Sequence, residues 1–224
     1  MDDDSTGDNM KSLKYILAIL TVAIGFLFIC PVEVHAAGND VVMLSDGEYF
    51  SPSYYVANNP DVTDAFGTDS GILSQHYLIN GRYEGRLPIS IETAKNYIIL
   101  MTNQLRAENG LPALVEDPAL DNIADVRASE EVSASRMDHY RQDGTSFRTA
   151  YTENGNCITS CGGENLARYG TLQQVIDLWM DSGSHRQNML YADYTKIGVG
   201  IAQKTSTDGL REATQYCYSQ EFAK

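Results

Sequence analysis

Three ionisable side chains lie in polar, small-residue surroundings and could do chemistry together. They are His139 in RMDHYRQDGTSF, Glu164 in CGGENLARYG and His185 in WMDSGSHRQNML. Neutral imidazoles and a carboxylate are ligands that zinc accepts, and an open fourth position would hold water. The separations of 25 and 21 residues match no short metal motif such as HExxH. Spacing alone therefore makes a shared zinc or other divalent-cation site one hypothesis among others.

The helices that must position these residues can be predicted from apolar spacing and from caps. Apolar residues at helical spacing run from Ala94 to Leu105, and Gly110 supplies a stop. Asp117-Pro118 is a cap followed by a proline suited to the first helical turn. Four helices are expected, over 93–109, from 118 to about 135, from 171 to about 183, and a short one from 184.

The C-terminal part changes to the spacing of strands. Ile197, Val199 and Ile201 alternate with small residues, and 212–222 forms a second extended run after a turn at Asp208-Gly209. This pattern predicts a hairpin. Helices followed by strands indicate an α+β domain in which helices cover an antiparallel sheet, and the length suits about three layers.

The N-terminus has the pattern of a secretory signal. An uncharged apolar run, Tyr15–Cys30, follows two lysines, and small residues at Val34 and Ala36 allow cleavage after Ala36. We expect a signal peptide over 1–36, with Met10 as the true start because the acidic prefix does not suit such a signal. The alternative is an uncleaved membrane anchor. In both cases the rest of the chain is expected to be secreted or on the cell surface.

Residues 37–88 are expected to form a small helical module or spacer. Ser51-Pro52 and Asn59-Pro60 each place a cap residue before a proline suited to a first turn. The strings YFSPSYYVANNPDV and HYLINGRYEGR resemble a short module found beside other domains in bacterial secreted proteins. His76 is expected to be a hydrogen-bonded packing residue.

The net charge of the chain excludes one class of binding partner. The formal charge of -14, from 16 basic and 30 acidic residues, would repel a phosphate backbone, so we expect no nucleic-acid partner.

Three cysteines follow the expected cleavage site: Cys157, Cys161 and Cys217. Either a Cys161–Cys217 or a Cys157–Cys161 bridge is possible outside the cytoplasm, and a catalytic thiol is disfavoured.

Several strings in order resemble one known family. NQLRAENGLPAL, MDHYRQDG, GGENLA, WMDSGSHRQNML, YTKIGVGIA and YCYSQEF are similar to the bacterial branch of the CAP superfamily, also called the SCP domain. That superfamily includes cysteine-rich secretory, antigen 5 and plant pathogenesis-related proteins. The resemblance covers about 91–222 and implies a domain over 89–224. It also implies the family's three-layer α-β-α sandwich with an antiparallel sheet, which the predicted order of elements fits.

The resemblance also implies roles for individual residues. His139, Glu164 and His185 would line a large open cleft that can hold a zinc-like cation, together with Ser182 and Asn188. Ser182 stands where eukaryotic members have a second acid, so the acid and histidine set is incomplete.

Other residues that match the family admit a structural role. Asn103 and Arg106 either form a solvated helix face or, as the resemblance implies, fix the following loop. Trp179 falls on the apolar stripe of its helix and is expected in the core. Asn165 and Asn188 are expected to hydrogen-bond backbone near the cleft, and Gly198 and Gly200 to permit close packing.

Binding is favoured over catalysis as the function. The expected ligand is apolar, a peptide or derived from the cell wall, with a divalent cation as a possible cofactor. A metal-dependent hydrolase using the same cleft is the alternative, but Ser182 removes one candidate general base. A third hypothesis is a wall-associated adhesin or spacer with 44–88 as its contact surface. Membrane contact is expected only through an uncleaved N-terminal segment.

Overall fold

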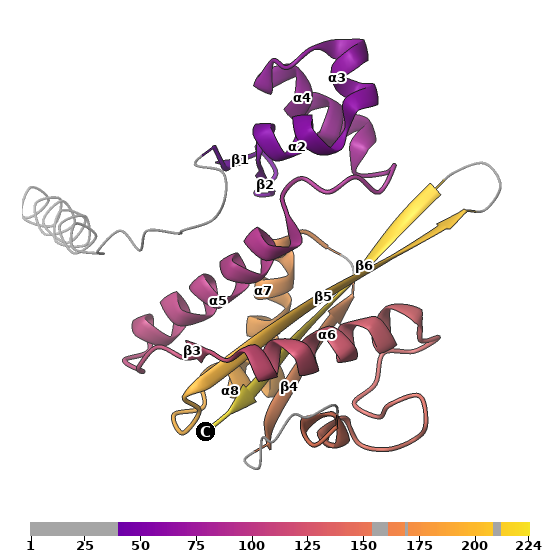
Figure 1. Cartoon of the computed structure of the whole chain (residues 1–224). Coiled ribbons are helices and arrows are strands. Elements are labelled where there is room, and N and C mark those ends of the chain that lie inside the picture. Colours follow the sequence, from indigo (N-terminus) through magenta and orange to yellow (C-terminus); the bar gives the residue numbers. More distant parts are fainter. Residues whose placement is uncertain (1–39, 154–160, 169, 208–211) are drawn as a thin grey trace, which may run out of the picture. The chain divides into compact units, whose positions relative to one another are not determined.

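The computed structural model describes residues 40–153, 161–168, 170–207 and 212–224, which all belong to one compact unit (Figure 1). The expected signal peptide over 1–36 lies outside these residues. Within the described ranges, no helix has both the length and the apolar character needed to cross a membrane.

Residues 40–88 form a small helical segment with its own core. Two short strands, β1 (Val42–Met43) and β2 (Tyr49–Phe50), pair antiparallel. They precede α2 (Pro52–Asn58), α3 (Pro60–Phe66), α4 (Ser70–His76) and a π-helical turn, η2 (Tyr77–Gly81). The buried side chains come from every one of these helical elements and from β2: Phe50, Tyr55, Val62, Leu73 and Tyr77.

The predicted cap and proline pairs explain where the helices of this segment begin. The Ser51 hydroxyl accepts the backbone N–H of Tyr54, as expected of a capping serine. Asn59 precedes α3, but its side chain donates to the carbonyl of Tyr55 and makes no cap bond. His76 Nδ1 lies 3.0 Å from the Tyr55 hydroxyl, which confirms its packing role.

The rest of the chain alternates helices with the strands of one sheet. Its elements are α5 (Ile91–Glu108), β3 (Val115–Glu116), α6 (Pro118–Ser133), the 3-10 helix η3 (Phe147–Tyr151), β4 (Cys161–Arg168), α7 (Leu172–Asp181), α8 (Gly183–Met189), β5 (Lys196–Thr207) and β6 (Glu212–Ala223). The strand order is β3-β5-β6-β4. The four predicted helices and the predicted hairpin of β5 and β6 are therefore confirmed, and the Asp208-Gly209 turn lies outside the described residues.

The sheet differs from the prediction in two places. The segment Cys161–Arg168, for which no strand is predicted, is strand β4, and it pairs antiparallel with β6. Strand β3 runs parallel to β5, so the sheet is mixed and not purely antiparallel. Both strands are held by partners that lie far away in the sequence, which local patterns do not reveal.

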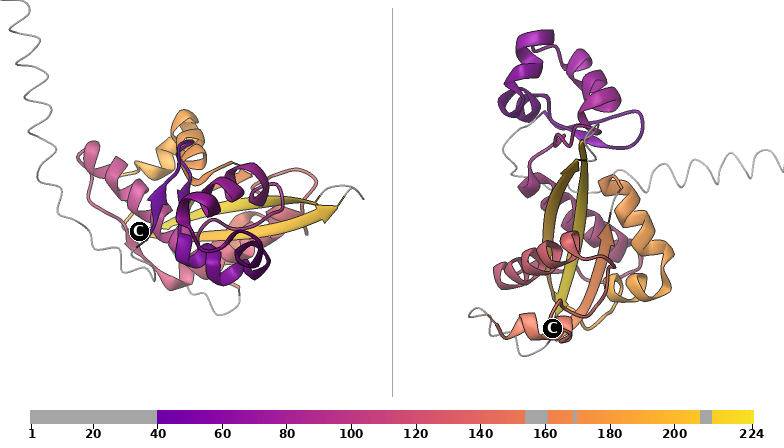
Figure 2. Two further views of the ribbon diagram at one scale, coloured as in Figure 1. Left: turned by 90° about the horizontal axis from the view of Figure 1, so that it is seen from above. Right: turned by 90° about the vertical axis from the view of Figure 1, so that its right-hand side faces the viewer.

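Alternation along β5 produces the three layers (Figure 2). Ile197, Val199 and Ile201 share a buried core with side chains from α5 and α7. Gly198 and Gly200 point the other way, against α6, where an added Cβ would lie 2.2 Å and 2.1 Å from backbone carbons of Leu120 and Ala124. The close packing expected of these glycines is confirmed, because only a missing side chain allows such an approach.

The small segment contacts the sheet domain closely. The rings of Tyr49 and Tyr97 lie 4.2 Å apart, and the Tyr216 hydroxyl donates to the carbonyl of Gly85 at 3.4 Å. A Cβ at Gly85 would lie 1.7 Å from Thr214 Oγ1, and the φ of +76° at Gly85 also favours glycine. The two parts therefore meet with backbone directly against a β6 side chain.

The proposed Cys161–Cys217 bridge is wrong. Cys217 is a free, buried thiol. In the β4–β6 register, Cys161 lies opposite Ala223, whereas Cys217 lies opposite Arg168 at the other end of the strand pair. Disulfides need Cα atoms within about 7 Å, and a strand advances about 3.3 Å per residue. The alternative partner, Cys157, lies outside the described residues.

Candidate functional site

Folding brings His139 and Glu164 into direct contact. His139 lies on the loop after α6, and Glu164 lies on β4. His139 Nδ1 is 2.7 Å from Glu164 Oε1, with the imidazole side chain 52% exposed and the carboxylate side chain 0% exposed. The backbone N–H of Phe147 donates to the His139 carbonyl at 2.9 Å, which fixes the loop at this point.

A buried guanidinium balances the charge of Glu164. Arg127, on α6, donates through Nε to Glu164 Oε2 at 2.6 Å. Its other nitrogens reach Glu130 at 2.6 Å, Glu131 at 3.1 Å and the carbonyl of Asp138 at 2.9 Å. Arg127 therefore joins α6, β4 and the loop that carries His139, and it holds Glu164 in one orientation.

The two imidazoles have opposite electrostatic surroundings. The hydrogen bond to Glu164 raises the pKa of His139. Burial lowers the pKa of His185, and a positive charge on nearby His139 lowers it further. His185 is therefore neutral at pH 7. Its Nδ1 is buried and has no hydrogen-bond partner within the described part of the chain.

Two asparagines fasten α8, which carries His185, to β4. Asn188 Nδ2 donates to the Glu164 carbonyl at 3.2 Å and to Asn165 Oδ1 at 2.9 Å. Asn165 Nδ2 donates to the His185 carbonyl at 3.1 Å. A Cβ at Gly163 would lie 2.3 Å from Asn188 Oδ1, so glycine is needed there. The expected hydrogen bonds from Asn165 and Asn188 to nearby backbone are confirmed.

Ser182 lies at the junction of α7 and α8. It ends α7 and is the residue before the first turn of α8. Its hydroxyl lies 3.3 Å from that of Ser184, and no hydrogen bond joins it to His139, Glu164 or His185 in the described structure. Its place among the cleft residues stays a prediction.

A buried carboxyl that the sequence analysis missed lies directly opposite Glu164. Glu221 on β6 is its cross-strand partner and is fully buried. It accepts the Tyr151 hydroxyl at 2.8 Å and the Ser219 hydroxyl at 3.1 Å. Burial raises the pKa of Glu221 well above its usual value, and the charge of Glu164 raises it further. The string YCYSQEF is the available signal, but as a strand and as a family string it assigns no site role to Glu221.

Arg106 and Asn103 fix the segment that follows α5. Arg106 is fully buried and donates to four carbonyls, those of Pro112, Met189, Tyr191 and Tyr194. Asn103 exchanges two hydrogen bonds with the backbone of Leu114. The solvated-face alternative is therefore wrong, and the role implied by the family resemblance is confirmed.

Trp179 lies in the core, as predicted. It is fully buried and donates from its indole N–H to the Leu166 carbonyl at 3.1 Å. This bond ties α7 to β4, the strand that carries Glu164.

Glu164 is already hydrogen-bonded on both of its carboxylate oxygens, one to Arg127 and one to His139. In the described ranges, no cluster of three or more His, Cys, Asp or Glu side chains could hold a metal ion. The geometry offers two imidazoles, with Glu164 orienting one of them, and the three-residue set stays a prediction.

Comparisons with solved structures find the same fold. An outer surface protein from Borrelia burgdorferi matches with a TM-score of 0.50 and 20% identity, over 61% of this chain and 96% of that one. An extracellular SCP-domain protein from Bacillus anthracis matches with a TM-score of 0.49 and 20% identity, over 62% and 45%.

Two sequence relatives come from one bacterium, Bacillus subtilis. The uncharacterized protein YkwD of Bacillus subtilis is 28% identical over 131 residues, 53% of this chain and 46% of its own. The uncharacterized membrane protein YlbC of the same organism is 28% identical over 116 residues, 51% and 33%. The matches therefore span less than half of these relatives. The profile of the cysteine-rich secretory protein family matches residues 99–222, more than half of the sequence. The chain belongs to this family, the CAP family, in its bacterial form.

Proposed function

We propose that this protein is exported and that its CAP-domain cleft binds an apolar, peptide or cell-wall-derived ligand without catalysing a reaction. The cleft residues are His139, Glu164, His185, Ser182 and Asn188. The observation that carries the proposal is that the pKa values of the two imidazoles are shifted in opposite directions. His139 is oriented by a buried carboxylate, and His185 is neutral and has a nitrogen without a hydrogen-bond partner in the described structure.

The orientation of His139 supports a binding role. Its Nδ1 is taken by Glu164, so Nε2 is the nitrogen left for a ligand, on a ring that is about half exposed. His185 brings Nδ1 without a partner in the described structure. A buried polar atom of this kind gains when a ligand or a bound water satisfies it.

The same two imidazoles suit a divalent cation such as zinc. Neutral imidazole nitrogen is a common zinc ligand, and a histidine that ligates through one nitrogen usually bonds a carboxylate through the other. His139 and Glu164 have that relation. A bound cation would supply a Lewis acid for an anionic or carbonyl group of the ligand. His139 and His185 would hold it, and Glu164 would keep His139 in the required orientation.

The surroundings of the imidazoles favour binding over covalent catalysis. A nucleophilic mechanism needs a hydroxyl or thiol within hydrogen-bond reach of a base. Within the described ranges, no Ser, Thr or Cys side chain is hydrogen-bonded to either imidazole, and Ser182 contacts Ser184. Burial raises the pKa of Cys217 to about 12, so this thiol is not a nucleophile at neutral pH.

Export is supported by the sequence and by one structural relative. The apolar run followed by a cleavage-like site predicts a secretory signal. The Borrelia protein with the same fold is an outer surface protein. Edman sequencing of the protein recovered from culture medium would yield Ala37 as the first residue if cleavage occurs after Ala36.

Zinc titration of the purified protein by calorimetry tests the cleft. The wild type is expected to bind one zinc ion, and the double variant His139→Ala, His185→Ala is expected to lose that binding. His76→Ala is the matched control, because it removes an imidazole from the small segment, where His76 contacts Tyr55. Equal affinity in wild type and double variant would remove the cation from the proposal.

A peptide library separates binding from hydrolysis. Incubation with the zinc-loaded protein is expected to give retained peptides and no cleavage above that of the double variant. Cleavage that depends on both histidines would overturn the binding proposal in favour of the hydrolase.

A further inference from the structure

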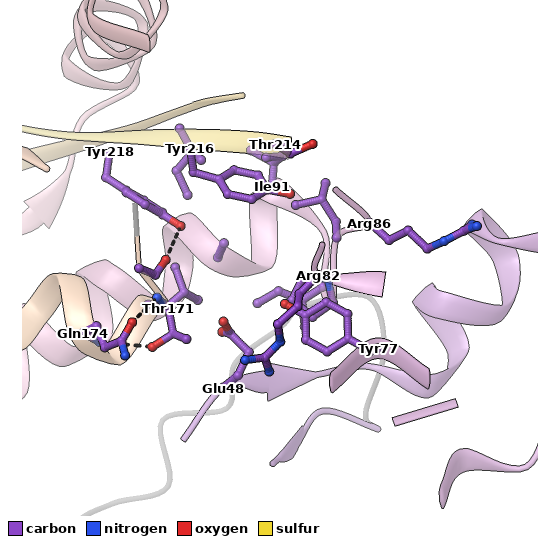
Figure 3. Close-up of a pocket in the computed structure, with 17 residues that line it drawn as sticks. Glu48, Tyr77, Arg82, Arg86, Ile91, Thr171, Gln174, Thr214, Tyr216 and Tyr218 are labelled. Atoms are coloured by element: carbon purple, nitrogen blue, oxygen red, sulfur yellow. Dashed lines mark hydrogen bonds between the residues drawn. The ribbon is translucent and has the colours of Figure 1, made fainter. Parts of the chain in front are cut away.

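A cavity lies where the small segment meets the sheet domain. It has a volume of about 250 Å³ (Figure 3). The small segment contributes Glu48, Tyr77 and Arg82, and the sheet domain contributes Tyr216 and Tyr218 among others. None of the five proposed cleft residues lines it. A space of this volume accommodates a compact ligand.

The cavity contains a buried carboxylate with spare hydrogen-bonding capacity. Glu48 is only 6% exposed, and its Oε1 accepts the N–H of Tyr49 at 3.2 Å. Burial raises its pKa to about 7, against the lowering effects of Arg82 and of the backbone amides of Tyr49 and Leu172. In Figure 3 the carboxylate points into the space below Tyr216 and Tyr218. It can accept hydrogen bonds that the protein does not supply.

The cavity also contains a buried donor without an acceptor. Arg82 bonds Asp46 through Nη2 at 2.6 Å and stacks over the Tyr77 ring, with Cζ 5.3 Å from the ring centre. Its Nε is buried and has no hydrogen-bond partner in the part of the chain that the structure describes. Buried donors are almost always satisfied in folded proteins, so this N–H needs an external acceptor.

The tyrosines present rings more than hydroxyls to the cavity. The Tyr218 hydroxyl donates to the Gly170 carbonyl at 3.2 Å, and the Tyr216 hydroxyl donates to the Gly85 carbonyl at 3.4 Å. With these hydroxyls engaged, the ring surfaces of Tyr77, Tyr216 and Tyr218 and the side chains of Ile91 and Ile201 form apolar walls. Such walls pack against a flat C–H surface.

The mixture of charges disfavours simple ions as occupants of the cavity. An anion would face Glu48, and a cation would face Arg82 and Arg86. An entirely apolar ligand would desolvate both groups and satisfy neither. A neutral molecule that both donates and accepts hydrogen bonds, and that also has an apolar face, can hydrogen-bond the charged groups and pack against the apolar walls.

We propose that this cavity binds a single sugar ring. Ring hydroxyls donate to Glu48 and accept from the Arg82 guanidinium, and the C–H face of the ring packs on Tyr216 and Tyr218. The site is independent of the CAP cleft and gives the small segment a binding role beyond that of a spacer.

Saturation-transfer NMR on the full mature chain tests this site with methyl glucoside and N-acetylglucosamine as probes. Millimolar binding of at least one sugar is expected. Glu48→Gln is expected to weaken it at least tenfold, and Glu92→Gln, which makes the same change at an exposed carboxylate on α5, is expected to leave it unchanged. Ala94→Leu fills the cavity from α5 and is expected to abolish binding while the protein remains folded.

Other outcomes overturn the proposal. Absence of any sugar signal, or equal binding to folded Ala94→Leu, would remove the site. Binding of choline or acetate in place of sugars would replace the sugar assignment with an ion. The double variant His139→Ala, His185→Ala keeps sugar binding if the two sites are separate, so failure of the cleft proposal is distinguishable. A β-1,4-linked tetramer of N-acetylglucosamine tests whether the bound ring is a glycan end or a free sugar.

Discussion

The residues of the proposed cleft and the junction cavity use buried charge in opposite ways. In the proposed cleft, both carboxylate oxygens of Glu164 are hydrogen-bonded within the protein, one to Arg127 and one to His139. At the junction, Glu48 accepts a hydrogen bond from the neighbouring backbone, and Arg82 has a donor left over. Satisfied groups orient their neighbours, whereas unsatisfied ones are available to a ligand. The comparison assigns the buried charges of the cleft to support and those of the junction to recognition.

Loss of Arg127 should give the largest effect. Arg127→Met leaves Glu164 and Glu131 buried without their cation, and breaking a buried pair in this way costs about 3–5 kcal/mol. We expect the free energy of unfolding from urea titration to fall by that amount, and zinc binding to weaken with the loss of His139 orientation.

Arg136→Met is the matched control for Arg127. Arg136 is 82% exposed and pairs with Asp138 at the surface. The urea midpoint should stay within experimental scatter of the wild type. A similar loss in both variants would show that the buried network does not hold the cleft together.

The pH dependence of stability should distinguish the junction from the cleft. The folded pKa of Glu48 is about 7 and its usual value is 4.5, so the folded chain binds more protons between these values. Stability therefore falls as pH rises through that window, by about 3 kcal/mol at most. Glu48→Gln removes this loss, and we expect its unfolding temperature to exceed that of the wild type at pH 8 and to match it near pH 4.

The control for this pH series is the exposed Glu92→Gln variant. Its unfolding temperature should follow that of the wild type at every pH. A wild-type curve that does not change between pH 5 and pH 8 relative to Glu48→Gln would contradict the burial of Glu48 as a charged group.

The smallest expected effects concern the two cleft imidazoles. In NMR titrations, His139 should titrate above its usual pKa of 6.5 and His185 below it. Since the folded pKa of His139 is raised, its contribution to stability is fully present below pH 6.5 and is lost as pH rises through the folded pKa. Glu164→Gln should lower the His139 pKa, and identical titration of both histidines would contradict the described geometry.

Much of the fold could be predicted because helix ends are locally encoded. Thr171 begins α7 through a capping box with Gln174, and Gly110 follows α5 at a φ of +70°. Strand β4 could not be predicted in the same way. Its sequence CGGENLAR has little strand preference, and its register shifts between Cys161 and Glu164. Pairing with β6, far along the chain, makes this segment a strand.

The site was predictable only where a motif marked it. His139, Glu164 and His185 stand out by residue type and polar surroundings, and the family strings imply that they share a cleft, whereas the sequence patterns do not mark Arg127 and Glu221. Arg127 lies on a helix whose apolar stripe gave the prediction, and nothing local shows that a charged residue there is buried. Glu221 lies on a strand that was recognised by its alternation, so its partnership with Glu164 depends on a register that only the folded sheet defines.

The absent side chains at Gly198 and Gly200 set the position of the first imidazole. Helix α6 sits with its backbone against β5 at these two points, which determine how far the helix stands from the sheet and where along the strand it lies. The loop bearing His139 continues from the far end of the same helix. A methyl group at either glycine would push α6 away from the sheet and move the His139 ring away from Glu164. The lack of a side chain at these two positions therefore affects a site at the other end of α6.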